Sequence, residues 1–206
     1  MQQGSEEWFK ARCGKATASR IADIIARTKS GYAASRKNYE AQLIVERITG
    51  NVESGFCSPA MQWGIDTEPQ ARNAYQFLTD TEVEEVGFVD HPTIRMAGAS
   101  PDGLVSVAGL VEIKCPNTAT HLETLANEKV PQKYITQIQW QLACTNREWC
   151  DFVSFDPRLP EAMRMFKVRV ERDDKFIAEV EKEVEEFLNI VSEKVEKLIS
   201  QYGEVA

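Results

Sequence analysis

The sequence predicts an α/β fold in which a central mixed sheet is flanked by helices. Three observations support this class. The first part of the chain carries hydrophobic residues at the three- and four-residue spacing of helices. A middle part, from about residue 82 to 114, is rich in Val, Ile and Phe and is interrupted by turn residues, as strands are. From about residue 173 the chain returns to a strong helical pattern.

The N-terminal part is expected to be helical. Thr17 or Ser19 is a candidate N-cap for the second helix, and Gly50 ends the pattern of the third. Tyr39 and Leu43 lie four residues apart on one face of that third helix. The helices expected here are residues 5–12, 17–27, 36–49 and 59–78.

The rest of the chain is expected to alternate strands and helices. His91-Pro92 has the composition of a turn between two strands, and Pro116 stops the strand before it. Pro131 suits the first turn of a helix. The strands expected here are residues 82–90 and 93–99, a short one before residue 106, and 110–114, 149–155 and 165–170. The expected helices are residues 131–145 and an amphipathic, acidic helix at about 173–201.

Length and composition predict one domain spanning residues 1–206. With 43% hydrophobic residues the chain can bury a sizeable core, and no internal repeat or low-complexity linker divides it. No apolar run approaches the ~18–20 residues that cross a bilayer. The polar start, Met1 to Trp8, does not have the pattern of a secretory signal. We therefore expect a cytoplasmic protein without a membrane segment.

The five cysteines, Cys13, Cys57, Cys115, Cys144 and Cys150, are scattered and include no C-x-x-C pair. This argues against a disulfide framework and against a zinc or iron–sulfur site. The two histidines, His91 and His121, match no metal-ligand motif and are expected in turns or at the surface.

The net charge of −8 counts against a simple basic nucleic-acid-binding protein. The acidic residues, however, are concentrated after Lys175, whereas Lys and Arg are frequent in the first 47 residues. A local basic surface is compatible with this distribution. Carboxylates that bind a metal also add negative charge for a functional reason.

Three residues have the pattern of a catalytic metal site. Asp102 lies in a Ser-Pro-Asp-Gly turn, and Glu112 and Lys114 follow on one strand. Side chains alternate along a strand, so Glu112 and Lys114 point to one side while Val111 and Ile113 point into the core. A hairpin near Ala108-Gly109 brings Asp102 beside Glu112.

Two carboxylates beside an ammonium are costly in a core unless a cation lies between them. Carboxylate oxygens without His or Cys suit Mg²⁺ or Mn²⁺, and the carbonyl of Ile113 is a further candidate ligand. Such a site activates water, and Lys114 can orient it. The simpler alternative is that Glu112 and Lys114 are ordinary residues on the wet face of a strand.

The motifs together resemble the PD-(D/E)xK nucleases. More narrowly, the chain is similar to the phage lambda-type alkaline exonucleases and YqaJ-like viral recombinases. Four motifs carry this likeness in order along nearly the whole chain: Trp8 to Ser19, Trp63 to Glu68 with Ala71-Arg72, Ser100 to Gly103 with Glu112 to Pro116, and Tyr134 with Gln137 to Gln139.

The resemblance implies a restriction-endonuclease-like core and a two-metal, Mg²⁺-dependent 5′-to-3′ exonuclease, with Mn²⁺ as a substitute. Such an enzyme digests one strand of linear double-stranded DNA to mononucleotides and leaves a 3′ single-stranded overhang for annealing recombination. It implies that Asp102, Glu112 and the Ile113 carbonyl hold metal, that Glu68 completes the metal and water shell, and that Lys114 positions the water.

The resemblance further implies that Arg12, Ser19, Ser100 and Gln137 bind the terminal 5′ phosphate. Each has an ordinary alternative: a surface arginine, a helix cap, a turn residue and an exposed helix residue, respectively. Glu68 taken alone is likewise a solvated helix residue. It is the joint match that favours the functional roles.

The family also implies a ring-shaped homotrimer around DNA, a single-strand annealing recombinase as partner, and a phage or prophage context in a bacterial host. Contact between the acidic C-terminal helix and that partner is a weaker hypothesis, because such a helix is also explained by packing. Two rival functions stay open: a PD-(D/E)xK endonuclease of other specificity, and a catalytically inert DNA-end-binding module.

Overall fold

The computed structural model describes residues 1–52 and 58–203. The helices in these residues are α1 (Glu6–Arg12), α2 (Ile21–Ile25), α3 (Ala34–Thr49), α4 (Pro59–Thr79), α5 (Thr118–Asn127), α6 (Gln132–Thr145) and α7 (Asp174–Tyr202), with short 3-10 helices η1 (Ala18–Arg20) and η2 (Glu161–Met163). The strands are β1 (Ala16–Thr17), β2 (Arg27–Thr28), β3 (Gly31–Tyr32), β4 (Val83–Glu84), β5 (Val89–Asp90), β6 (Ala97–Ala99), β7 (Gly103–Val105), β8 (Gly109–Lys114), β9 (Trp149–Phe155) and β10 (Met165–Glu171).

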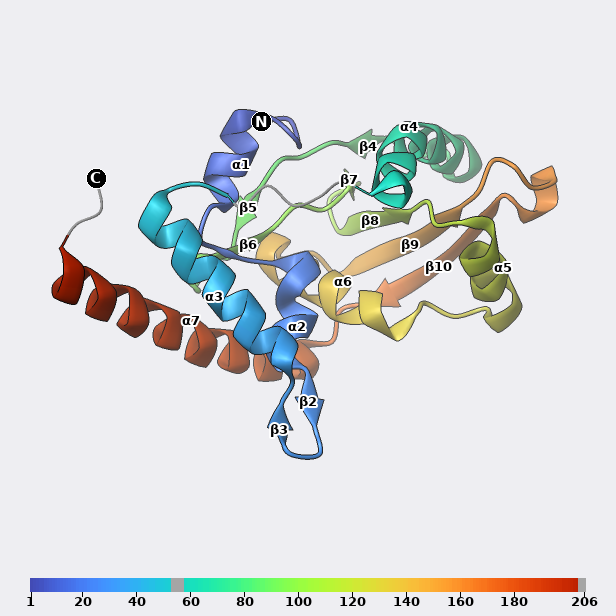
Figure 1. Cartoon of the computed structure of the whole chain (residues 1–206). Coiled ribbons are helices and arrows are strands. Elements are labelled where there is room, and N and C mark those ends of the chain that lie inside the picture. The colour runs from blue at the N-terminus through green and yellow to red at the C-terminus, as the bar shows by residue number, and fades with distance from the viewer. Residues whose placement is uncertain (53–57, 204–206) are drawn as a thin grey trace.

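A five-stranded sheet in the order β10-β9-β8-β7-β4 forms the centre of the fold. β8 and β9 are parallel and the other pairs are antiparallel, so the sheet is mixed. Helix α4 lies above these strands in Figure 1 and α6 below them. The predicted α/β class with a central mixed sheet is therefore confirmed.

The two faces of the sheet bury different residues, because side chains alternate along each strand. On one face Ala71 and Tyr75 of α4 pack in a cluster with Val111 of β8. On the other, Ile138 and Leu142 of α6 pack in a cluster that includes Leu110 and Phe152. The strand β8 is thus covered on both sides, which fixes the position of every side chain along it.

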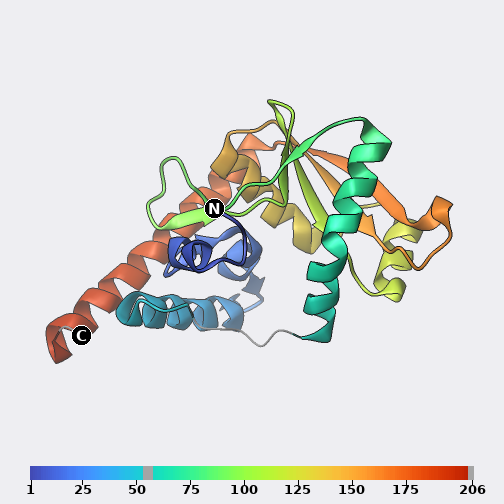
Figure 2. The ribbon, with the colours of Figure 1, turned by 90° about the horizontal axis from the view of Figure 1, so that it is seen from above.

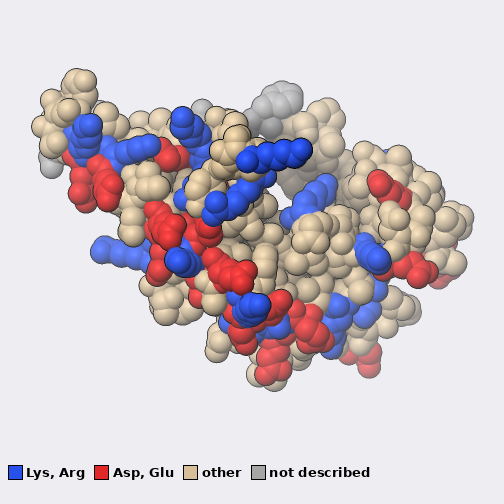
Figure 3. Space-filling model, turned by 90° about the horizontal axis from the view of Figure 1, so that it is seen from below, with Lys and Arg blue, Asp and Glu red and all other residues tan. Residues whose placement is uncertain are grey.

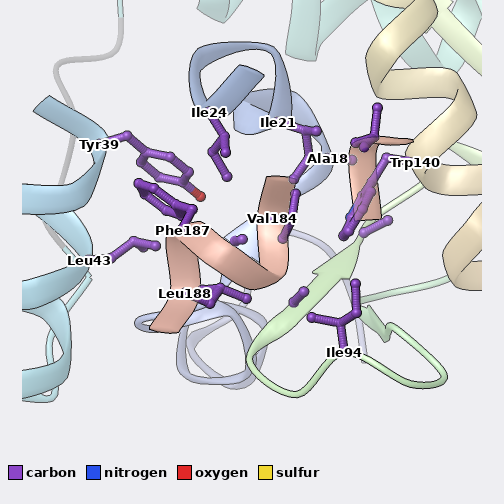
Figure 4. Packing of buried hydrophobic residues seen from close by; sticks show 14 of the residues in the cluster. Ala18, Ile21, Ile24, Tyr39, Leu43, Ile94, Trp140, Val184, Phe187 and Leu188 are labelled. Atoms are coloured by element: carbon purple, nitrogen blue, oxygen red, sulfur yellow. The ribbon is translucent and has the colours of Figure 1, made fainter. Parts of the chain in front are cut away.

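A second core joins α2, α3, α6 and α7 beside a smaller sheet of β1, β6 and β5. Figure 4 shows Tyr39 and Phe187 facing each other there, and their rings are stacked at 5.8 Å. The apolar stripe of α7 packs into this core through Val180, Val184, Phe187, Leu188 and Val191.

The helix α7 begins at an N-cap, Asp173, whose side chain accepts a hydrogen bond from the Phe176 amide. In Figure 2 it runs diagonally past α3 to the C-terminal end of the chain. Its outer face is polar, and acidic side chains follow its diagonal course in Figure 3. No helix in the described residues has the length and apolarity to span a membrane.

Several predicted elements are wrong in extent. The helix expected at residues 17–27 is a short strand, a 3-10 turn and the five-residue α2, because Ala16 and Thr17 pair in parallel with β6 instead. Neither Thr17 nor Ser19 makes the expected cap hydrogen bond. The strand expected at 93–99 begins only at Ala97, because residues 92–96 form a loop in which Met96 adopts a left-handed φ of 64°.

Helix α5, the strands β2 and β3, and the 3-10 helix η2 were not predicted. Helix α5 packs on β9, and the small hairpin β2-β3 extends between α2 and α3 (Figure 1). The histidine prediction is confirmed for His91, which lies in the turn between β5 and β6 although its side chain is buried, and is wrong for His121, which is buried in α5. His121 lies between Ser154 Oγ and the Met163 carbonyl, at 2.7 and 2.8 Å, and is a structural residue.

Candidate active site

The hairpin of β7 and β8 brings Asp102 beside Glu112. Gly103 pairs with Val111, so the residue before Gly103 lies opposite Glu112. The Asp102 Oδ2 atom accepts a hydrogen bond of 2.6 Å from the Ile113 amide. This contact ties the turn that carries Asp102 to the strand that carries Glu112, as the sequence pattern predicts.

The Glu112 side chain is fully buried beneath α6. Its Oε1 atom accepts from Gln137 Nε2 at 2.6 Å and is in contact with Lys114 Nζ, and its Oε2 atom accepts from Gln141 Nε2 at 2.7 Å. A carboxylate that is buried away from solvent needs hydrogen-bond donors or a positive charge to replace the lost water. The alternative that Glu112 is an ordinary residue on a wet strand face is therefore wrong, because α6 covers its side chain.

Lys114 is the cation of this cluster, and its side chain is 27% exposed. Burial opposes its charge, but the negative charges of Glu112 and Asp102 raise the pKa of Lys114 above its ordinary value. The ammonium also lies 5.4 Å from the centre of the Tyr134 ring. Lys114 thus stays protonated beside two carboxylates.

Glu68 approaches the cluster from α4. Its Oε1 atom accepts from Arg72 one turn later at 2.6 Å, and Arg72 also pairs with Glu85 at 2.7 Å. Burial raises the pKa of Glu68. The positive charges of Arg72 and Lys114 oppose this shift, and the negative charge of Glu112 adds to it. Glu68 is therefore within electrostatic range of Glu112 and Lys114, although Arg72 is its only side-chain hydrogen-bond partner within residues 1–52 and 58–203.

The pKa of Asp102 is raised well above its ordinary value, first by burial and then by the charges of Glu112 and Glu68. Three carboxylates share one ammonium in this cluster. A bound divalent cation relieves that imbalance of charge.

The donor set fits Mg²⁺ or Mn²⁺. No group of three or more His, Cys, Asp or Glu side chains in residues 1–52 and 58–203 is arranged to enclose a metal alone. Mg²⁺ does not need such a cage, since it usually takes one or two carboxylates and fills its shell with water and substrate phosphate. Asp102 and Glu112 supply two carboxylates, and the Ile113 amide joins the two segments by donating to Asp102 Oδ2.

Arg12, Ser19, Ser100 and Gln137 line one cavity of about 170 Å³. They come from α1, η1, the turn before Asp102, and α6, so only the folded chain brings them together. The Gln137 amide that borders this cavity also donates to Glu112. The cavity and the carboxylate cluster are therefore adjacent.

Trp8 organises one wall of this cavity. Its ring lies 3.9 Å from the Arg12 guanidinium, and its Nε1 atom donates to Ser100 Oγ at 2.9 Å. Burial lowers the pKa of Arg12, and nearby Glu46 opposes that shift. Within residues 1–52 and 58–203 no carboxylate pairs with Arg12, so its guanidinium is available to an anion.

A larger cavity of about 680 Å³ opens beside the first, between α1, α3 and α4. Trp8, Arg12 and Ser19 line both cavities, and Glu68 lines the larger one. Its walls combine apolar side chains, including Met61 and Ile65, with basic and acidic ones. On the face seen in Figure 3, Lys and Arg side chains lie around a hollow, away from the acidic band of α7.

The cysteines show no role at this site. Cys13, Cys115, Cys144 and Cys150 are free thiols, and Cys57 lies outside the described residues. Burial and the nearby charges of Glu68 and Asp102 raise the pKa of Cys115 to about 12, so it remains a thiol. Sequence reasoning missed the contacts of Trp8, Arg72 and Gln141; the one signal for Gln141 was its four-residue spacing from Gln137.

Comparison with known proteins gives a family match and close structural relatives. The model of the YqaJ-like viral recombinase domain matches residues 7–148. The crystal structure of an alkaline exonuclease from Laribacter hongkongensis, LHK-Exo, is 53% identical, with a TM-score of 0.91 over 98% of this chain and 100% of that chain. A structure of LHK-Exo in complex with dAMP agrees equally well.

One more distant structure supports the fold, and one more distant relative is known by sequence. A phage-related exonuclease from Haemophilus somnus 129PT has 18% identity and a TM-score of 0.69 over 91% of this chain and 96% of that chain. The uncharacterized protein R354 of Acanthamoeba polyphaga mimivirus is 27% identical over 170 residues. That match covers 74% of this chain but only 29% of the mimivirus protein.

Proposed function

The chain belongs to the YqaJ-like viral recombinase domain family, and from this premise we propose that it is a Mg²⁺-dependent nuclease that digests one strand of linear double-stranded DNA from the 5′ end. The observation that carries this proposal is the adjacency of two features. A carboxylate and lysine cluster of Asp102, Glu112 and Lys114 borders a cavity lined by Arg12 and Gln137.

The carboxylate cluster supplies the metal ligands in this proposal. Asp102 and Glu112 would hold the metal with the Ile113 carbonyl, and Glu68 would complete the shell of metal and water. Two Mg²⁺ ions are expected, and Mn²⁺ can replace them. When bound, Mg²⁺ lowers the pKa of a coordinated water and stabilises charge on the reacting phosphate.

The remaining residues act on the water and on the DNA end. Lys114, which stays protonated beside Glu112, orients the attacking water and donates to the charge that develops on phosphate. Arg12 offers a planar fork to the terminal 5′ phosphate, and Ser19 and Ser100 donate hydroxyl groups to it. Gln137 contacts both the cavity and Glu112, so it links binding of the end to the site of cleavage.

A relative supports the release of mononucleotides. LHK-Exo has been crystallised with dAMP, a nucleoside monophosphate of the kind that an exonuclease of either polarity releases. We propose that this chain likewise releases mononucleotides and leaves a 3′ single-stranded overhang. In the family context we further propose a homotrimeric ring around DNA, a single-strand annealing recombinase as partner, and action in the cytoplasm of a bacterial host. The division into one nuclease domain stays a prediction.

The central experiment is digestion of linear duplex DNA labelled separately at the 5′ and the 3′ end, with Mg²⁺ and with a chelator. We expect early release of the 5′ label as mononucleotide, late release of the 3′ label, and no release with the chelator. Cleavage of closed circular DNA at the same rate would favour the endonuclease alternative. Binding to ends without cleavage in Mg²⁺ or Mn²⁺ would favour the inert module.

The phosphate cavity has its own test. Arg12→Ala should lower the preference for 5′-phosphate over 5′-hydroxyl ends about 10- to 100-fold, because a hydrogen bond to a charged group contributes about 1.5–3 kcal/mol. Arg95→Ala, an exposed arginine outside both cavities, is the matched control. An unchanged end preference in Arg12→Ala would exclude Arg12 from the phosphate site.

A further inference from the structure

Three of the four glutamines on α6 make different buried or partly buried contacts. Gln137 and Gln141 lie four residues apart on one face of the helix and donate to the two oxygens of Glu112, at 2.6 and 2.7 Å. Gln139 lies on the other side, where its amide bonds the Glu171 carbonyl and the Asp173 amide. One helix therefore carries two glutamines that face the carboxylate cluster and one that fixes the chain between β10 and α7.

Gln141 is fully buried, as is the carboxylate that it contacts. Its Nε2 atom donates to Glu112 Oε2, while its Oε1 atom is buried without a hydrogen-bond partner in the described residues. A buried amide oxygen without a donor is unfavourable. Gln139, in contrast, uses both ends of its amide. The contact with Glu112 is thus the one polar interaction that the Gln141 side chain makes in residues 1–52 and 58–203.

Gln141 differs from Gln137 in its position relative to the cleft. Gln137 borders the phosphate cavity, and both Gln137 and Lys114 contact the Oε1 atom of Glu112. Gln137 therefore lies where substrate would bind. Gln141 lines neither cavity described above and holds the opposite oxygen, Oε2, from the buried side. It can reach the reaction only through Glu112.

We propose that Gln141 is a positioning residue that fixes the Glu112 carboxylate in the orientation required for metal binding. This inference rests on the proposed function of Glu112 as a metal ligand. A carboxylate that rotates freely presents either oxygen to the cleft. In Glu112, Gln141 donates to Oε2 while Gln137 and Lys114 contact Oε1, and together these contacts define one orientation. Partners that orient metal ligands in this way typically change metal affinity or activity by about 10- to 100-fold when they are removed.

The test compares Gln141→Met with Gln139→Met. Methionine keeps the length and unbranched shape of glutamine but lacks the amide donor. Calorimetry in the absence of DNA gives the dissociation constant for Mg²⁺, and a cleavage assay gives the Mg²⁺ concentration for half-maximal cleavage. We expect Gln141→Met to raise the dissociation constant and the half-maximal concentration about 10- to 100-fold. Gln139→Met should lower the melting temperature and leave both Mg²⁺ values within about threefold of wild type, since the contacts of Gln139 lie away from Glu112.

A second comparison tests whether Gln141 acts through Glu112. Glu112→Asp withdraws the carboxylate by one methylene, so Gln141→Met should weaken Mg²⁺ binding much less in that background than in wild type. Equal weakening in both backgrounds would overturn the inference, and so would wild-type Mg²⁺ affinity in Gln141→Met. If Gln141→Met fails to fold, Gln141→Asn, which draws the amide back by one methylene, gives the same comparison.

The two proposals fail in distinguishable ways. A wild-type protein that neither binds Mg²⁺ nor cleaves linear DNA would reject the proposed function, whatever the variants do. A wild-type protein that cleaves normally, together with a Gln141→Met variant that matches Gln139→Met in Mg²⁺ binding, would reject only the role of Gln141.

Discussion

Replacing Lys114 with alanine separates the step of catalysis from the binding of metal. In the folded chain the Lys114 ammonium contacts Glu112 and lies near Asp102 and Glu68. With Asp102, Glu112 and Glu68 all ionised, the three carboxylates and one ammonium have a formal charge of −2, and removing Lys114 makes it −3. The metal ligands themselves stay in place.

The size of the effect follows from this arrangement. Loss of one group that stabilises developing charge costs about 10²- to 10³-fold in rate, or about 2.7–4 kcal/mol. Breaking a buried ion pair costs about 3–5 kcal/mol of stability, and we expect the lower end because Lys114 is 27% exposed. Bound Mg²⁺ should offset that loss, since the cation compensates the extra negative charge. Mg²⁺ affinity should therefore be equal to wild type or higher.

The assay measures three quantities on wild type, Lys114→Ala and Lys133→Ala: the single-turnover cleavage rate, the Mg²⁺ dissociation constant, and the melting temperature with and without Mg²⁺. Lys133 is the matched control because it also lies over the Tyr134 ring, at 4.8 Å, and contacts no carboxylate of the cluster in the described residues. A Lys114→Ala rate within tenfold of wild type, or weaker Mg²⁺ binding in that variant, would refute the reasoning. An equal loss of rate in Lys133→Ala would show that only local positive charge matters.

Three further predictions concern packing, pH and the phosphate cavity. Gly109→Ala should destabilise the protein by about 1–3 kcal/mol in chemical denaturation, because its Cβ would lie 2.1 Å from the Trp149 ring; unchanged stability would show that the ring moves freely. Burial lowers the pKa of His91 in the folded chain. As the pH drops below about 6.5, the unfolded chain therefore binds a proton before the folded chain does, and the free energy of unfolding should fall. The loss is at most about 1.4 kcal/mol for each unit by which folding lowers the His91 pKa. His91→Gln should lose that part of the slope between pH 7.5 and 5.5, and an identical slope would place its cause elsewhere. Trp8→Phe keeps a ring under Arg12 but removes the donor to Ser100, so the preference for 5′-phosphate ends should fall about 2- to 10-fold, measured as the ratio of KM values on the two kinds of end.

Local pattern was sufficient for the elements whose contacts are close in sequence. The hairpin that pairs Asp102 with Glu112 depends on a turn and on the alternation of side chains, and both are visible within residues 102–114. Helix α7 has seven apolar residues at regular spacing, and its observed bounds, Asp174–Tyr202, differ by one residue from those expected. Strands β9 and β10 also occur where the pattern predicts them.

Local pattern failed where distant segments decide the backbone hydrogen bonds. Residues 16–17 have helical neighbours, yet they join β6, some eighty residues away, and this pairing breaks the expected helix. Residues 93–96 are expected to begin a strand, but the buried ring of His91 accepts a hydrogen bond from the Ile94 amide and holds this segment in a loop. Helix α5, with Asn117 as its N-cap, was not recognised at all, although its cap is of a preferred type.

The sequence by itself determined the α/β class, the pairing of Asp102 with Glu112 and Lys114, and the family that these motifs indicate, because each depends on residue types at short or regular spacing. Only the tertiary structure decided that Arg12, Ser19, Ser100 and Gln137 share a cavity, that Glu112 is buried, and that Gln141 holds its second oxygen. The physical reason is that burial and convergence depend on how α6 packs over β8 and how α1 meets the turn before Asp102. Those contacts join residues that no local spacing connects.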